Sequence, residues 1–304
     1  MKFCVCFQSL IITAVCCSCS VCHGDDAASI AKELCVVQDP LILEASGMAT
    51  CRTMENAVWM HNDSGDAARL FLVGFDGATI AIVNVKGVTA FDWEDVCSFE
   101  MNGESWLLVG DIGDNGRQRS VTSPTCQLLL LKEPKLNVSK VNATAVTEVS
   151  IDVIRTIEFQ FPDGPHDCES LAVDTTTKTI LLVTKSTPTN CAMYSLPLTL
   201  ISGKEKLTAN RVTPISATFA TAMDLSPDGR RLAIVNMLGG VLLTRNDPQN
   251  DFWADASMNG LTTLKLPPRK QGESVCFTAD GNSLLLNSEG ARQPLWQIDL
   301  PHLK

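Results

Sequence analysis

Short apolar runs and polar turns alternate along this chain in a repeating unit. Five segments open with a hydroxyl or acidic residue, and an apolar run begins 11 residues later in four of them and 12 residues later in the other. The segments open at Ser46, Glu94, Glu169, Thr221 and Glu273, and the apolar runs begin at Ala57, Trp106, Ile180, Leu232 and Leu284. Pairs such as Asn102-Gly103 and Asp280-Gly281 lie between the two parts and favour tight hairpins. Each unit therefore predicts a strand, a turn and a second strand.

Two further apolar segments follow in most units, so each unit predicts four antiparallel strands. Four-stranded units of about 45–55 residues are typical of the blades of a β-propeller. We predict an all-β fold with five blades, and six as the alternative, because the second unit is longer than the others. Its excess length falls in a polar insertion at about residues 133–149. The last unit lacks a fourth strand, which Leu34–Val37 could supply to close the ring.

The N-terminus has the order of a secretory signal. Lys2 precedes a mostly apolar run from Phe3 to about Cys22, and polar residues follow Gly24. The alternative is a membrane anchor, but the strongly apolar part is short for a span of roughly 20 residues. We expect a signal peptide at residues 1–24, a single propeller domain at residues 25–304, no membrane span after cleavage, and a secreted or periplasmic protein.

Charge and cysteine content exclude several classes of partner and site. The chain has 34 acidic and 24 basic side chains and no basic run, which disfavours nucleic acid as a partner. Of 13 cysteines, six lie in the expected signal peptide, and the spacing of the others matches no zinc site. We expect a monomer whose partner is a small molecule or another protein.

The first strand of each propeller blade lines the central channel, so the opening residues should form a ring at one mouth. Carboxylates that close to one another repel unless they are protonated or bridged by a cation. Oxygen ligands in this number suit Ca²⁺. We predict a calcium site made by Ser46, Glu94, Glu169 and Glu273.

The second strand of each blade returns to the same mouth and ends in polar residues. We predict that these ends bind a ligand, through Asn62, Asp63, Asp111, Asp114, Asn236 and Glu289. Proton transfer or charge stabilisation could come from His61, His166 and Lys185. The alternative is that the two aspartates at 63 and 114 only form turns and that the two histidines are satisfied loop residues. No nucleophilic serine elbow and no phosphate-binding glycine loop occurs.

Several of these segments together resemble a family of exported bacterial β-propeller proteins to which no reaction is assigned. The matching pieces are Glu44-Ala-Ser-Gly-Met, Trp59-Met-His-Asn-Asp-Ser-Gly, Asp92-Trp-Glu-Asp, Gly110-Asp-Ile-Gly-Asp-Asn, Pro162-Asp-Gly-Pro-His-Asp-Cys-Glu-Ser-Leu and Thr184-Lys. The resemblance covers most of residues 41–290 and implies an exported propeller. A looser likeness connects the chain to calcium-dependent nucleotidases, phytase-like esterases and lactonases, none of whose catalytic sets matches residue by residue.

Three functions fit these observations. The first is a propeller that binds a small ligand or a partner on its acidic face, with a divalent cation at the channel. The alternative is a metal-dependent hydrolase of a small ester, lactone or phosphoester, and the third is a structural role in the cell envelope. The sequence alone leaves open whether the protein is an enzyme, because one fold supports all three functions.

Overall fold

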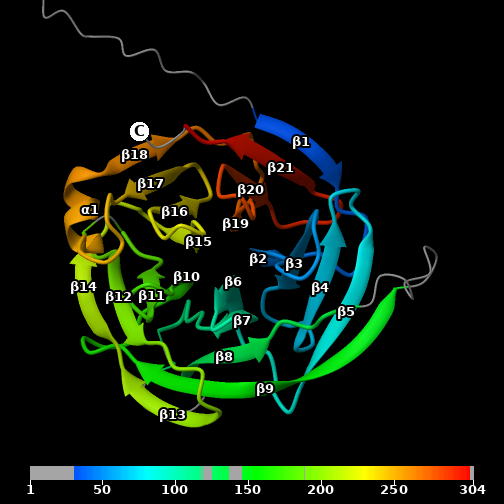
Figure 1. Cartoon of the computed structure of the whole chain (residues 1–304), viewed down its shortest axis with the longest axis horizontal. Helices are drawn as coiled ribbons and strands as arrows, with labels where there is room; N and C mark the ends of the chain where they lie inside the picture. The colour runs from blue at the N-terminus through cyan, green and yellow to red at the C-terminus, as the bar shows by residue number, and fades with distance from the viewer. Residues whose placement is uncertain (1–30, 118, 120–124, 137–145, 188, 302–304) are drawn as a thin grey trace, which may run out of the picture.

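The fold is a β-propeller, in which short antiparallel strands surround one central axis (Figure 1). The computed structural model describes residues 31–117, 119, 125–136, 146–187 and 189–301, so the expected signal peptide lies outside the described residues. No helix in those ranges has the length and apolar character needed to cross a bilayer.

The described strands supply five four-stranded runs, each ordered from the channel outward. The first two runs are β2 (Ala45–Thr50), β3 (Ala57–Asn62), β4 (Arg69–Gly74) and β5 (Thr79–Lys86), and then β6 (Trp93–Met101), β7 (Glu104–Asp111), β8 (Cys126–Lys132) and β9 (Thr147–Gln160). The next two are β10 (Cys168–Asp174), β11 (Thr179–Thr184), β12 (Ala192–Pro197) and β14 (Asn210–Pro214), and then β15 (Ala220–Leu225), β16 (Arg231–Asn236), β17 (Gly240–Thr244) and β18 (Leu261–Leu264).

The last run confirms the prediction that an N-terminal strand closes the ring. It contains β19 (Ser274–Phe277), β20 (Ser283–Asn287), β21 (Pro294–Asp299) and, outermost, β1 (Ala31–Val36). Strand β1 pairs antiparallel with β21, from Ala31 opposite Ile298 to Val36 opposite Pro294. The outer edge of β21 is therefore covered by β1, which gives the last run four strands like the other runs.

Buried apolar clusters hold neighbouring runs together. One cluster joins the first two runs and contains the fully buried Trp59 together with Leu70, Val96 and Leu107. The Trp59 indole nitrogen also donates a hydrogen bond of 2.8 Å to Glu133 Oε1. Glu133 lies in the stretch that the sequence marks as a polar insertion, yet it is buried and links these two runs.

Three features of the outer fold are absent from the repeat pattern. Strand β9 is 14 residues long, and its first part, from Thr147, pairs in parallel with β5, which joins the first two runs into one nine-stranded sheet. Strand β13 (Gly203–Thr208) pairs in parallel with the second part of β9. A short helix, α1 (Trp253–Asn259), packs Trp253 into the apolar cluster between the third and fourth runs.

Four of the five innermost strands share an irregularity near their first residues. The register shifts between Ala45 and Gly47, Trp93 and Asp95, Cys168 and Ser170, and Ala220 and Ala222. Each shift therefore falls on one of the opening residues of the repeat. A β-bulge re-aims the side chain of the extra residue. The bulges explain why these positions depart from the apolar pattern of the strands that follow them.

Candidate functional site

The opening residues of the repeat lie buried at one mouth of the channel. Ser46, Glu94, Glu169, Thr221 and Glu273 are all at most 5% exposed. The Ser46 hydroxyl donates a hydrogen bond of 2.7 Å to the backbone oxygen of Glu94, and Thr221 donates one of 2.9 Å to the backbone oxygen of Gly272. These two hydroxyl groups therefore tie neighbouring inner strands together.

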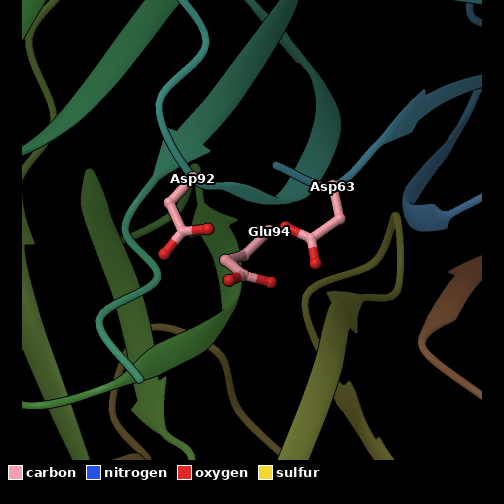
Figure 2. Close-up of side chains that lie close together, drawn as sticks. All are labelled: Asp63, Asp92 and Glu94. Atoms are coloured by element: carbon pink, nitrogen blue, oxygen red, sulfur yellow. The ribbon is translucent and has the colours of Figure 1, made fainter. Parts of the chain in front are cut away.

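Carboxylates gather on one side of this mouth in two overlapping triads. The first consists of Asp63, Asp92 and Glu94, and the second of Glu94, Asp167 and Glu169, with the oxygens of each triad within 4.8 Å of one another. Figure 2 shows the first triad, in which Asp92 and Glu94 at the start of β6 lie close to Asp63 after β3. Carboxylate oxygens so close together are the donor set of a hard divalent cation.

Burial raises the pKa values of all three members of the first triad, and repulsion within the triad adds to the increase for Glu94 and Asp92. Burial, followed by the charges of Glu169, Asp63 and Asp92, raises the pKa of Glu94 well above its usual range. Burial, together with the charge of Asp63, raises the pKa of the half-buried Asp92 to about 6, although Arg119 acts in the opposite direction. Burial is also the main cause of the raised pKa of Asp63. A cation placed among these groups would relieve the repulsion and lower all three pKa values.

The second triad already contains a positive charge. Lys185 Nζ lies 2.5 Å from Glu169 Oε1, and both side chains are largely buried. Burial raises the pKa of Glu169 to about 8 even though Lys185 lowers it. Burial acts to lower the pKa of Lys185, but the contact with Glu169 outweighs it and raises that pKa. Glu169 is thus already in an ion pair, whereas no described ion pair involves a member of the first triad, so the first triad is the better cation site.

Glu273 lies outside both triads and instead faces another carboxyl. Burial, followed by a hydrogen bond and the charge of Glu273, raises the pKa of Glu289 to about 8. Gln271 Nε2 also donates a hydrogen bond of 2.5 Å to Glu289 Oε2. Glu289 thus lies close to Glu273, and neither carboxyl belongs to the described cation clusters.

Gly113, in the loop after β7, lets that loop lie directly against two carboxylates of the first triad. A Cβ atom built on Gly113 would overlap Glu94 Oε1 and Asp92 Oδ2. The backbone of Gly113 also donates a hydrogen bond of 3.3 Å to the Asp92 carbonyl. The segment Gly110-Asp-Ile-Gly-Asp-Asn thus leaves space for two carboxylates that any side chain at position 113 would displace.

Four residues that we predicted as ligand-binding hold the loops around the mouth. Asn62 accepts hydrogen bonds from the backbone of Leu43 and Glu44. Asp111 is fully buried and forms an ion pair with Arg119, in which Arg119 Nη2 lies 2.6 Å from Asp111 Oδ1. Three further hydrogen bonds to Asp111 come from Gln127 Nε2 and from the backbone nitrogens of Phe91 and Asp92. Asp114 Oδ2 accepts a hydrogen bond from the backbone nitrogen of Arg119. Asn236 Oδ1 closes a turn by accepting hydrogen bonds from the backbone nitrogens of Leu238 and Gly239.

The two histidines have partners that limit their chemistry. His61 is 0% exposed, Nδ1 lies 2.9 Å from the Asn62 carbonyl oxygen, and burial lowers its pKa to about 4. It is therefore a neutral packing residue against Trp93 at neutral pH. His166 Nε2 lies 2.9 Å from Asp163 Oδ1 and 3.2 Å from the Tyr194 hydroxyl, in a cluster distinct from the two triads.

Asp92 and Asp167 complete the triads, and the ring prediction did not include them. Each lies two positions before a ring glutamate, in Asp92-Trp-Glu94 and Asp167-Cys-Glu169. This repeated Asp-x-Glu pattern is the sequence signal that could have found them, because side chains two apart share one face of a strand. The bulge at each glutamate obscures that alternation.

A further carboxyl lies beneath the mouth. Asp95 is fully buried, and its Oδ2 accepts hydrogen bonds from the backbone nitrogens of Leu171, at 2.9 Å, and Met223, at 3.2 Å. Burial raises the pKa of Asp95 well above its usual range, although these backbone donors lower it. Asp95 therefore ties β6 to β10 and to β15 across the channel.

No protein-family model matches the sequence, and no similar sequence was found among functionally described proteins. Among solved structures, a gluconolactonase from Xanthomonas campestris has a TM-score of 0.49 at 10% identity over 90% of each chain. The PQQ-bound aldose sugar dehydrogenase of Streptomyces coelicolor has a TM-score of 0.47 at 9% identity, over 90% of this chain and 98% of that one. Likeness at this level does not carry an activity from either protein to this one, so function is argued from the site itself.

Proposed function

We propose that the acidic mouth binds a divalent cation, with Ca²⁺ as the best candidate, and hydrolyses a small neutral ester or lactone. The single observation behind the proposal is the convergence of Asp63, Asp92 and Glu94, whose pKa values are all raised, mainly by burial. The same mouth in a binding protein without catalysis is the competing function.

The residues present fit a hard cation. All donors in the first triad are carboxylate oxygens, and none of the three is held in an ion pair among the described residues. Ca²⁺ accepts six to eight oxygens in irregular arrangements, which suits ligands from separate loops better than the strict octahedron of Mg²⁺. When bound there, a divalent cation supplies Lewis-acid polarisation of a carbonyl oxygen.

The chain's own residues provide the remaining chemistry. Asp92 is half-buried, and its carboxylate can act as a general base for a water molecule at the mouth. Lys185 is 22% exposed at its side chain and can donate a hydrogen bond to an oxygen that gains negative charge. A neutral substrate fits better than a phosphoester, because the mouth holds five carboxylates against a single lysine in the two triads.

Thermal unfolding in chelator and in Ca²⁺ tests the cation site. A cation that binds only the folded protein stabilises it by about 2.7 kcal/mol at one hundred times its dissociation constant. We expect the parent protein to melt at a higher temperature in Ca²⁺, and Glu94→Gln to lose most of that increase. The matched control is Glu104→Gln, which removes an exposed carboxylate at the opposite end of its blade. Equal responses of the parent and Glu94→Gln proteins would contradict the cation site.

Catalysis needs its own measurement, because a binding protein would pass the thermal test. We expect the Ca²⁺-loaded parent to hydrolyse chromogenic esters or lactones in a reaction that chelator abolishes. Asp92→Asn should lower kcat by about a hundredfold or more, as expected for loss of a general base. A protein that responds to Ca²⁺ but turns over no ester or lactone would be a binding protein, and the hydrolase proposal would fail.

A further inference from the structure

Exposed apolar side chains surround the acidic mouth. Six of them project from the loops at this end of the strands: Leu41, Leu43, Phe91, Phe219, Met237 and Leu238. We call this set the apolar rim. Four members lie within two residues of a group that forms or supports the mouth, as Phe91 does beside Asp92, and the backbones of Leu41 and Leu43 are hydrogen-bonded to Asn62. Large apolar side chains gathered on one face of a soluble protein mark a binding surface.

Phe219 is the most informative member of the rim. It lies two positions before Thr221, which is the place that Asp92 and Asp167 hold before their glutamates. Its side chain is 49% exposed, and its backbone has a φ of 51°. A bulky residue rarely adopts this left-handed conformation, which costs on the order of 1 kcal/mol or more. The conformation is fixed by the Phe219 backbone nitrogen, which donates a hydrogen bond of 2.9 Å to the Ser186 carbonyl next to Lys185.

Met237 and Leu238 extend the same apolar surface. They are 42% and 100% exposed in the turn between β16 and β17. Asn236 Nδ2 donates a hydrogen bond of 2.8 Å to the Thr218 carbonyl, which places this turn beside Phe219. The β15 side of the mouth is therefore apolar where the β6 and β10 sides are acidic.

We propose that the substrate of this mouth carries an aliphatic chain, which lies on the apolar rim over Phe219 and Leu238 while its ester or lactone group lies at the carboxylates. This proposal rests on the proposed hydrolase function. Burying a methylene contributes about 0.8 kcal/mol. The rim surrounds the polar centre, so one molecule with a polar end and an apolar chain satisfies both surfaces. The acidic mouth disfavours an anionic lipid surface as the occupant.

A chain-length series tests the proposal in the Ca²⁺-loaded full-length protein. With 4-nitrophenyl acetate, butyrate and octanoate, we expect kcat/KM to rise about two- to fourfold per methylene. The double variant Phe219→Asn/Leu238→Ser should lower the ratio of octanoate to acetate at least tenfold. Asparagine tolerates the left-handed backbone, so the first substitution keeps the local fold. Phe252→Ser, which alters a 70% exposed side chain at the opposite end of the blades, should leave the ratio unchanged.

Binding of Nile red, a neutral apolar dye without an ester, separates this proposal from the hydrolase function. We expect the parent and Phe252→Ser to enhance its fluorescence and the double variant to lose most of that enhancement. Dye binding at the rim without ester hydrolysis would sink the hydrolase while leaving the apolar surface in place. A chain-length ratio that is flat in the parent, or unchanged in the double variant, would overturn the aliphatic substrate. Adsorption to phosphatidylcholine vesicles with a flat ratio would instead assign the rim to a membrane.

Discussion

The two sides of the mouth use the same local backbone for opposite purposes. On the β6 and β10 sides, a bulged inner strand presents Asp92 with Glu94 and Asp167 with Glu169. On the β15 side, the same bulge presents Phe219 with Thr221. A repeated blade thus fixes where side chains enter the mouth, and the residue types at two positions decide whether that side attracts a cation or an apolar group.

The difference moves the centre of the site away from the channel axis. Five identical acidic blades would place the charge symmetrically, whereas here both triads share Glu94. Lys185 forms an ion pair with Glu169 of the second triad, whereas no described ion pair involves a member of the first. A substrate polarised at the first triad would therefore have the β15 side available for its other end. The following predictions test whether the two sides are as distinct as this geometry implies.

Removing the carboxyl that connects the two sides should have the largest effect. Asp95→Ala leaves the buried backbone nitrogens of Leu171 and Met223 without their acceptor. We expect a loss of about 3 kcal/mol in the free energy of unfolding, measured with urea. Asp95→Asn keeps an acceptor oxygen and should cost about 1 kcal/mol or less, because burial already favours the neutral acid there. Similar losses in the two variants would show that Asp95 does not act through these hydrogen bonds.

Filling the space beside the first triad should weaken the cation without altering any charge. In Gly113→Ala, the new methyl group would displace Glu94 and Asp92. We expect about a tenfold rise in the dissociation constant for Ca²⁺, a size that loss of a well-placed support for a metal ligand commonly produces. The control is Gly239→Ala on the β15 side, where a Cβ would meet nothing within 4 Å. Isothermal titration calorimetry measures the Ca²⁺ dissociation constant of each variant. Equal values for the two variants would contradict the cation site at the first triad.

The repeat pattern predicted the blades well because each strand's partner follows it closely in sequence. The pairing of β5 with β9 escaped prediction, since it joins Thr79–Lys86 to a polar segment far along the chain. For the site, alignment of the repeat found Glu94 and Glu169, which the structure brings together in the second triad. It did not distinguish Asn62 and Asp111 from ligand-binding residues, because polar groups that support a loop and those that bind a ligand look alike in sequence.

Acidity should stabilise the protein when no cation is present. The pKa values of Asp92, Asp224 and Glu169 are raised to about 6, 7 and 8, mainly by burial. A carboxyl with a raised folded-state pKa contributes stability that is complete below its unfolded pKa, near 4, and is lost as the pH rises through the folded value. In chelator, we expect the melting temperature to fall by several degrees between pH 5 and pH 8. The fall in melting temperature should be smaller in Ca²⁺ than in chelator. In chelator, it should also be smaller for Asp92→Asn than for the parent protein. A melting temperature that rises over this range would contradict the assignment.

The smallest effect should come from relieving the backbone strain at Phe219. This test compares the two sides of the mouth by backbone strain rather than by charge. Phe219 has a φ of 51°, and Asp92 at the equivalent position has no left-handed backbone. Phe219→Gly should therefore stabilise the folded backbone locally by about 0.5–1 kcal/mol, partly offset by the greater entropy of glycine in the unfolded chain. Asp92→Gly has no strain to relieve and should lower stability in Ca²⁺. Urea unfolding in Ca²⁺ would show opposite signs for the two variants. A loss above 1 kcal/mol in Phe219→Gly would mean that the ring stabilises the fold, and the case for a side chain held in place for a ligand would weaken accordingly.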